Sequence, residues 1–454
     1  MHVVLSFVFL PLTKNSIFHA VLGGSFERAI LWHKVLAKYV LILGSALHGG
    51  FFVFKWVFFP QTTFFKALTA EKNIYGFFAL GISLITLFFA QDHFRRNYYN
   101  IFRILHVSAL PLYLLFLRWH YHGEQLFGKL FVPLALLGVD LLFRLRNLFS
   151  RYEASIIEGP KPVGKNITMF RVRMKQPMRN YVLGQYAFIA IPDLSRFELK
   201  PLTLIPLSKI SLSSSLPASV SNSDSTEDDA STGLVSNKYS NTEFEILVKK
   251  SSTGDRWSDR ILKVLQPASR GVGGHGNNYY TVLLDGPYGS LSLPYELSRY
   301  NSVTMFAGGI GVTPFLALLA DPCVSKYWTL VWSVRDKKLL RYCLPRLVYS
   351  NATIKIHLTH TTDLESDFLP NFEDDEEERY GDLPAKHVSK SRPDIAWYIN
   401  EAIGRSKRNG MTAILVCGPE SMKRDATIAY EEHAVNMDMS GNGRIHFHAE
   451  TFEW

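Results

Sequence analysis

The chain has 454 residues, of which 47% are hydrophobic, and it carries a formal net charge of +9. This length allows two or three domains. Part of the positive excess comes from arginines that flank apolar segments, which argues against a nucleic-acid-binding surface. The cysteines, Cys323, Cys343 and Cys417, lack the spacing of metal ligands and are expected to be reduced thiols.

Long apolar blocks crowd into the first third of the chain. Four of them meet the requirement of roughly 20 mostly apolar residues for a transmembrane helix: Leu31–Pro60, Asn73–Gln91, Asn100–Trp119 and Gly128–Leu148. An earlier block, residues 3–12, is too short to span, and no signal-peptide cleavage site follows it. The sequence therefore predicts a multi-pass α-helical transmembrane domain over residues 1–150.

Basic residues predict the orientation of these spans. Arg95 and Arg96 lie in the short loop after the second block, and Arg144, Arg146 and Arg151 follow the last one. Cytosolic loops carry an excess of Lys and Arg, so both regions and the large C-terminal part should face the cytosol. The sequence leaves open whether the membrane is the plasma membrane or the endoplasmic reticulum.

Two of the expected spans carry paired histidines. His33 and His48 lie on the first, and His106 and His120 lie on the third. At about 100° and 1.5 Å per residue, such spacings keep both imidazoles on roughly one face, about 20 Å apart. Two helices running in the same direction would then pair His33 with His106 and His48 with His120. Each pair suits the two axial positions of a haem iron.

Other interpretations exist for these histidines. Each one alone could be an interfacial or helix-capping residue, and His122 competes with His120 for the outer position. Four histidines at matched depth favour ligation, because ionisable residues inside spans are functional candidates.

The C-terminal part begins with short alternating runs such as "NITMFRVRM" and "YAFIAIP". They predict the strands of a small antiparallel barrel over residues 151–298. The Ser-rich, acidic segment 211–241 lacks periodic apolar residues, which predicts a disordered insertion. The pattern "GVGGHG", residues 271–276, precedes a strand rather than a helix, so we reject it as a dinucleotide site.

A better candidate is "SVTMFAGGIGVTPFLALLAD", residues 302–321, which predicts a strand, a glycine turn and a helix. Gly308, Gly309 and Gly311 allow close backbone approach, and Thr313 can bond phosphate at the helix start. Later strands, "YWTLVWSVRD" and "TAILVCGPESM", alternate with helices. Arg335, near the end of the first of them, could bind the 2'-phosphate of a dinucleotide. Residues 299–454 are thus predicted to form a parallel α/β domain that binds its ligand at the carboxyl ends of the strands.

The joint order of these motifs resembles the ferric reductase and NADPH oxidase superfamily, and within it the fungal altered-inheritance-of-mitochondria type of probable metalloreductase. The resemblance covers nearly the whole chain. It rests on the paired helix histidines and on "KPLT" (Lys200–Thr203), "GPYG" (Gly286–Gly289), "GGIGVTPF" (Gly308–Phe315), "CGP" (Cys417–Pro419) and the terminal "HAETFEW".

The resemblance implies a haem-binding membrane domain followed by a ferredoxin-reductase-like module, with FAD, NADPH and two b-type haems as cofactors. It assigns FAD to Lys200, Pro201, Leu202 and Thr203, with its phosphates near Trp257 and Ser258. It assigns NADPH to Gly308, Gly309, Gly311, Thr313, Pro314 and Arg335, and its nicotinamide to Cys417, Gly418 and Pro419. Cys417 and Trp454, which could stack on the flavin ring, are the candidate catalytic residues; the haem ligands would be His33, His48, His106 and His120.

Three departures from the family pattern stand out. Lys200 replaces the usual His, the His33 to His48 spacing is one residue longer than that of His106 to His120, and the first family helix is missing or truncated.

The expected activity is an NADPH-dependent ferric or cupric reductase that carries electrons across the lipid bilayer to a metal ion or chelate. An oxidase that reduces dioxygen to superoxide is the first alternative. A non-catalytic membrane scaffold, which would bind a partner through residues 211–241, is the second. The sequence names no protein partner and gives no sign of nucleic-acid binding.

Overall fold

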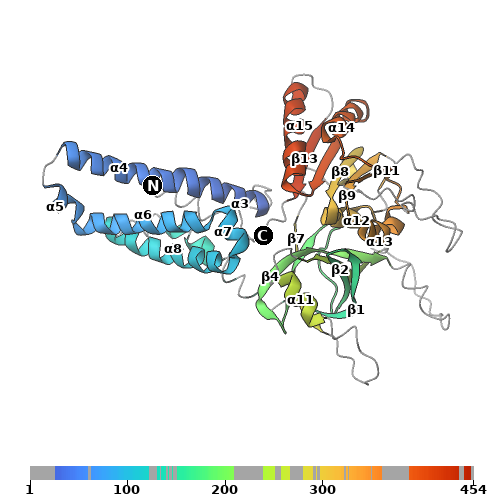
Figure 1. Ribbon diagram of the computed structural model, residues 1–454, viewed down its shortest axis with the longest axis horizontal. Coiled ribbons are helices and arrows are strands. Elements are labelled where there is room, and N and C mark those ends of the chain that lie inside the picture. The colour runs from blue at the N-terminus through green and yellow to red at the C-terminus, as the bar shows by residue number, and fades with distance from the viewer. Residues whose placement is uncertain are drawn as a thin grey trace, which may run out of the picture. The chain divides into compact units, whose positions relative to one another are not determined.

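The computed structural model describes residues 26–59, 63–121, 130–132, 134–139, 142, 146, 151–208, 239–250, 257–265, 280–289, 293, 297–321, 324–325, 327–348, 350–359, 388–438 and 444–450. The chain divides between Phe149 and Ser150 into two compact units, which are taken in turn (Figure 1). His122, Cys323, Trp454 and the segments 211–238, 271–276 and 372–379 lie outside the described residues.

The N-terminal unit is helical. Its first long helix runs without a break through α3 (Phe26–Val35), the π-helical segment η2 (Leu36–Ile42) and α4 (Leu43–Phe58). It is followed by α5 (Phe64–Leu68), α6 (Glu71–Phe89), α7 (Asp92–Asn97) and α8 (Tyr99–Tyr121). Among the described residues, three stretches are long and apolar enough to cross a membrane, Trp32–Phe58, Glu71–Phe89 and Ile101–Tyr121, which confirms the first three expected spans. Of the fourth, the described part is a shorter apolar helix, Leu130–Val139.

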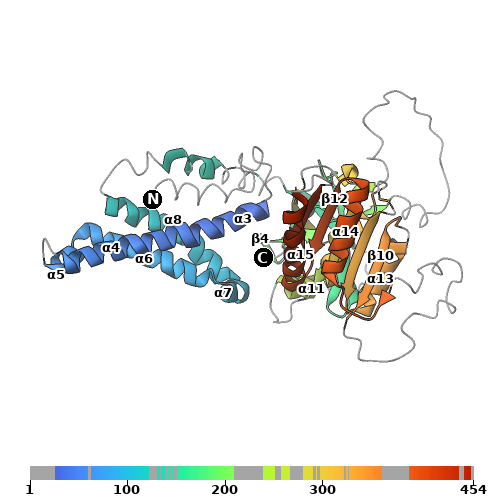
Figure 2. The same cartoon turned by 90° about the horizontal axis from the view of Figure 1, so that it is seen from above.

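Helices α6 and α8 pack along each other (Figures 1 and 2). The rings of Phe78 and Phe116 stack with centroids 5.2 Å apart. A small core of Leu41, Ala79, Tyr113 and Leu130 joins the first long helix to this pair. Many other large apolar side chains of this unit are exposed, as expected for helices whose outer surface faces lipid.

The C-terminal unit begins with a seven-stranded antiparallel sheet in the order β4-β3-β7-β1-β2-β6-β5. Its strands are β1 (Tyr152–Gly164), β2 (Ile167–Met174), β3 (Tyr186–Ile191), β4 (Ser195–Thr203), β5 (Ile205–Ser208), β6 (Tyr239–Lys249) and β7 (Thr281–Tyr288). The two outermost strands, β4 and β5, are separated in the chain by Leu204 alone, so the sheet must curl round on itself. This confirms the expected antiparallel barrel.

Strand β6 begins at Tyr239, two residues before the expected end of the insertion. Tyr239 pairs with Ser208 of β5. Its polar neighbours hid the strand start in the sequence.

The second sheet is parallel, in the order β11-β10-β9-β8-β12-β13. Its strands are β8 (Ser302–Gly308), β9 (Trp328–Val334), β10 (Thr353–Leu358), β11 (Val388–Ser389), β12 (Thr412–Cys417) and β13 (Ile445–Glu450). The chain winds outward from β8 through β9 and β10, then returns to place β12 on the other side of β8. A doubly wound sheet binds its ligand at such a reversal, outside the carboxyl ends of the strands.

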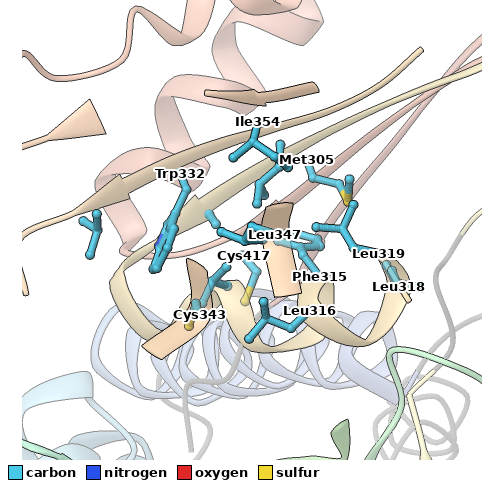
Figure 3. Packing of buried hydrophobic residues seen from close by; sticks show 14 of the residues in the cluster. Met305, Phe315, Leu316, Leu318, Leu319, Trp332, Cys343, Leu347, Ile354 and Cys417 are labelled. Carbon is cyan, nitrogen blue, oxygen red and sulfur yellow. The ribbon is translucent and has the colours of Figure 1, made fainter. Parts of the chain in front are cut away.

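Helices cover both faces of this sheet (Figure 2). One face packs under α12 (Thr313–Leu318) and α13 (Lys337–Val348), and the other packs under α14 (Ile395–Asn409) and α15 (Glu420–Asp438). Successive strand residues alternate between the two cores, as strand geometry requires. Met305 and Trp332 lie in the first core with Phe315 and Cys417 (Figure 3), and Phe306 and Val331 lie in the second.

The first core continues into the barrel, because Ile167, Met169 and Leu247 belong to the same cluster. A buried ion pair crosses the junction. Glu245 of β6 is fully buried and accepts two 2.7 Å hydrogen bonds from Arg346 of α13, while Arg171 lies 3.3 Å away. Burial alone would raise the pKa of Glu245, but the hydrogen bonds and charge of Arg346 outweigh burial and lower it.

Replacing Arg346 should therefore destabilise the C-terminal unit. In Arg346→Met the buried Glu245 carboxylate loses both of its 2.7 Å hydrogen bonds and keeps Arg171 and Tyr342 as partners, which should cost about 3 kcal/mol at neutral pH. The loss should shrink as pH falls, because a carboxylate with a lowered pKa contributes stability only where it is ionised. Thermal unfolding of the full chain in detergent at several pH values measures both effects.

The matched control is Arg424→Met, which removes an exposed arginine 3.7 Å from Asp425. It should change stability by less than about 1 kcal/mol. A loss in Arg346→Met that is no larger than in this control, or that grows toward acid pH, would contradict the assignment.

Candidate functional site

The four span histidines meet in two pairs. The ring centroids of His33 and His106 are 6.0 Å apart, and those of His48 and His120 are 6.3 Å apart. One member of each pair lies on the first long helix, and the other lies on α8. The pairing is the one that the sequence predicts.

His120 is held in a definite orientation. Its Nδ1 lies 2.6 Å from the carbonyl oxygen of Lys72, in the first turn of α6. A carbonyl can only accept a hydrogen bond, so Nδ1 carries the proton and the lone pair of Nε2 is left available. Such a hydrogen bond on the far nitrogen is typical of metal-ligating histidines.

Gly76 makes room for this ring. A Cβ atom at Gly76 would lie 2.7 Å from two ring atoms of His120, closer than side chains approach each other. Gly81, one and a half turns further along α6, has nothing within 4 Å of the corresponding position. The close fit of α6 against the imidazole therefore depends on one glycine.

A cavity of about 390 Å³ adjoins the His48 and His120 pair. Its wall includes aromatic side chains, among them Phe52, Trp56 and Phe77. A mostly apolar lining with a few convergent polar groups is typical of a cofactor pocket.

At the inner pair, His106 is available as a ligand. Its Nδ1 is buried and makes no hydrogen bond to any described residue. Its ring also contacts Phe102, at 5.1 Å between centroids.

In the C-terminal unit, β3 brings two of the quoted motifs together. Tyr186 pairs with Thr203 of "KPLT" on one side and with Tyr288 of "GPYG" on the other. Its ring packs against Phe188 and Tyr288, at 5.7 and 6.3 Å between centroids. Gly289 is needed here, because its φ of +83° and its closeness to the Tyr186 ring exclude a side chain.

A hydroxyl contact then links the barrel to the glycine turn. The Thr313 hydroxyl, at the start of α12, donates to the Thr203 hydroxyl over 3.5 Å, and both side chains are buried. The predicted flavin motif and the predicted nucleotide motif thus adjoin each other.

Two turns pack tightly at the reversal of the parallel sheet. A Cβ atom at Gly308 would lie 2.3 Å from Cδ of Pro419, and one at Gly311 would lie 2.2 Å from the carbonyl oxygen of Cys417. These glycines therefore serve the contact between the "GGIG" and "CGP" turns. Gly309 differs, because it has a φ of +55° and nothing within 4 Å of its Cβ position. It is the glycine that leaves the backbone open to a ligand.

The remaining predicted residues are spread around this edge. Trp257 belongs to the barrel core, whereas Ser258 is half-buried in the first turn of α11 (Trp257–Leu265). Pro314 is buried inside α12, and Arg335 is exposed directly after β9, beside the glycine turn. Cys417 is a buried thiol at the end of β12 and forms no disulfide with another described residue.

Sequence reasoning missed several residues that shape the site. The indole of Trp332 donates a 2.9 Å hydrogen bond to the Gly309 carbonyl and so fixes the open turn. Gly76 and the Lys72 carbonyl set the position of His120. The small residue inside an apolar span was the available signal for Gly76, but nothing local pointed to its partner.

Comparisons with known proteins agree with this layout. Residues 2–117 match the family model described as the ferric reductase like transmembrane component, and residues 300–429 match the ferric reductase NAD binding domain. The chain belongs to the ferric reductase family. The two matches contain the span histidines up to His106 and the two turns at the reversal of the parallel sheet.

Relatives within the family are similar over most of this chain. "Ferric reductase transmembrane component 1" of Schizosaccharomyces pombe is 23% identical over 93% of this chain and 73% of its own length. "Ferric/cupric reductase transmembrane component 2" of the same organism is 24% identical over 96% and 77%. "Ferric reduction oxidase 8, mitochondrial" of Arabidopsis thaliana is 26% identical over 75% of this chain but only 42% of its own length.

The turn packing yields a prediction for the nucleotide site. Gly311→Ala forces the "GGIG" turn away from Cys417, and overpacking of this kind costs about 1–3 kcal/mol. We expect the affinity for a nicotinamide nucleotide to fall about tenfold or more, measured as the KM for its oxidation with ferricyanide.

Gly404→Ala is the control, because that glycine of α14 has nothing within 4 Å of its Cβ position. Alanine there should leave the KM unchanged and stabilise the helix by about 1 kcal/mol. An unchanged KM in Gly311→Ala would show that the two turns do not form the nucleotide site.

Proposed function

We propose that this ferric reductase family member is a membrane metalloreductase. It would carry electrons from cytosolic NADPH, through FAD and two haems, to ferric or cupric ions on the opposite side of the membrane. The observation that carries the proposal is the pairing of four imidazoles at two depths on two helices. About 20 Å separates the two depths, which is most of the thickness of a membrane's apolar core.

The spacing within each pair fits one iron. Two iron–nitrogen bonds of about 2 Å, with roughly 1 Å more from each nitrogen to its ring centre, give about 6 Å between ring centroids. The separations of 6.0 and 6.3 Å match this sum.

The donor set also favours haem over a metal held by protein alone. Among the described residues there is no group of three or more His, Cys, Asp or Glu side chains that could hold a metal ion. Two imidazoles suffice only where a macrocycle supplies the other ligands. His33 and His106 would hold the inner haem, and His48 and His120 the outer one.

The soluble residues fit the two organic cofactors. Thr203 and Pro201 of β4 would hold FAD against the Tyr186 and Tyr288 rings, with Ser258 near its phosphates. The open backbone at Gly309 would receive the NADPH phosphates, and Arg335 would meet the 2'-phosphate. When bound, FAD accepts two electrons as hydride and releases them singly, and haem iron carries one at a time.

Protein groups at the flavin site would orient the two ligands and exclude water. Thr203 and Thr313, which share a hydroxyl contact, would keep the two ligands adjacent. The "CGP" turn, pressed against the glycine turn, would place Cys417 beside the nicotinamide and keep water from the hydride path. Trp454 would cover the other side of the flavin, as the family resemblance implies.

The names of the fungal relatives support metal ions as acceptors, whereas dioxygen is the alternative. The test gives NADPH to purified, haem-loaded protein, with a ferric chelate under nitrogen and, separately, in air with a superoxide probe. We expect rapid anaerobic iron reduction and little superoxide. Superoxide with slow iron reduction would make the chain an oxidase, and no NADPH consumption in either assay would favour a scaffold.

Gly76 provides a prediction for the outer haem. Gly76→Ala should displace the His120 ring and lower the haem content from two to about one per chain, read from absorbance against protein concentration. Gly81→Ala, on the same helix with open space at its Cβ position, should keep both haems. Equal haem content in the two variants would argue against His120 as a ligand.

A further inference from the structure

The two histidine-bearing helices differ in histidine spacing. His106 and His120 are 14 positions apart on α8, whereas His33 and His48 are 15 positions apart on the first long helix. In a regular α-helix each additional residue adds about 100° of rotation. Two regular helices with these spacings would therefore fail to align both histidine pairs, because one ring would point about a quarter turn aside.

The structure nevertheless aligns both pairs. The centroid separations at the two depths, 6.0 and 6.3 Å, are nearly equal. Something between His33 and His48 must take up the additional residue.

The π-helical segment η2 lies between these two histidines. At its end the Leu43 N–H donates to the carbonyl of Lys38, five residues back rather than four. A π turn is wider than an α turn, so it accommodates one more residue while the flanking helix continues in register. By contrast, α8 is α-helical from Tyr99 to Tyr121.

We propose that η2 is a register-correcting element that lets His33 and His48 face His106 and His120 at the same time. Leu41 anchors the wide turn, since it is the buried residue of the segment and packs in the core with Ala79 and Tyr113. The inference rests on the proposed function for the identity of the ligand, whereas the alignment itself is a property of the helices.

A single-residue deletion tests the proposal. Val40 lies in η2 and is 40% exposed, so its deletion removes little packing. Without it the segment can become α-helical with a histidine spacing of 14. We expect the variant to keep two haems per chain and the low-spin absorbance of iron with two imidazole ligands.

The matched control deletes Leu112, an apolar residue of α8 that is 46% exposed and lies midway between His106 and His120. No π turn exists on α8 to absorb the change, so the histidines should lose alignment and at least one haem should be lost. An alanine inserted between Val40 and Leu41 exceeds the capacity of η2 and should also cost one haem.

The outcomes separate the inference from the proposed function. If the Val40 deletion loses a haem or cannot be extracted as a monodisperse protein, or if the Leu112 deletion keeps both haems, η2 does not correct the register. If the unaltered chain binds no haem under conditions that load FAD, the proposed function fails instead.

Discussion

Facing imidazoles across two helices impose the tightest constraint on the membrane unit. In the proposed function the two rings of each pair would share one iron, so they must lie about 6 Å apart, and both pairs must form at once on the same two helices. This requirement limits the depth of each histidine, the rotation of each helix and the distance between the two helices. It accounts for features that apolar packing alone leaves unexplained: the π turn in the first helix, the glycine beneath His120 and the carbonyl of Lys72 that orients that ring.

A comparable constraint acts in the C-terminal unit, where two turns must meet at the reversal of the parallel sheet. Gly308 and Gly311 leave no room for a Cβ because the "CGP" turn occupies that space. Only Gly309 remains open, with its carbonyl fixed by the Trp332 indole. The Glu245 and Arg346 pair joins the barrel to α13, and the Thr313 and Thr203 hydroxyls meet where α12 adjoins the barrel. The barrel and the parallel sheet are therefore joined by both a buried ion pair and a buried hydroxyl contact.

Periodicity predicts most of the architecture. Apolar blocks predict three described spans, alternation predicts the barrel, and strand–helix alternation predicts the parallel sheet. The histidine pairing could be predicted from matched depth on two helices, whereas the π turn that aligns both pairs could not, because regular helix geometry would turn one ring about 100° aside. Gly76, Trp332 and the Glu245–Arg346 pair could not be predicted, since each acts through a partner distant in the chain. Gly308 and Gly311 show the limit of a motif, because the same glycines that suggest a ligand contact are required by a neighbouring turn.

The distribution of packing explains why the first long helix, rather than α8, contains the correction. Helix α8 packs along α6, and its His120 end is tied to Lys72 and pressed against Gly76. An irregular turn there would disturb all of these contacts. Helix α4 has no buried residue, so its rotation is only weakly fixed by neighbours. An additional residue therefore costs least in η2, where Leu41 alone is buried and the loss of regular hydrogen bonding is offset by two aligned histidines.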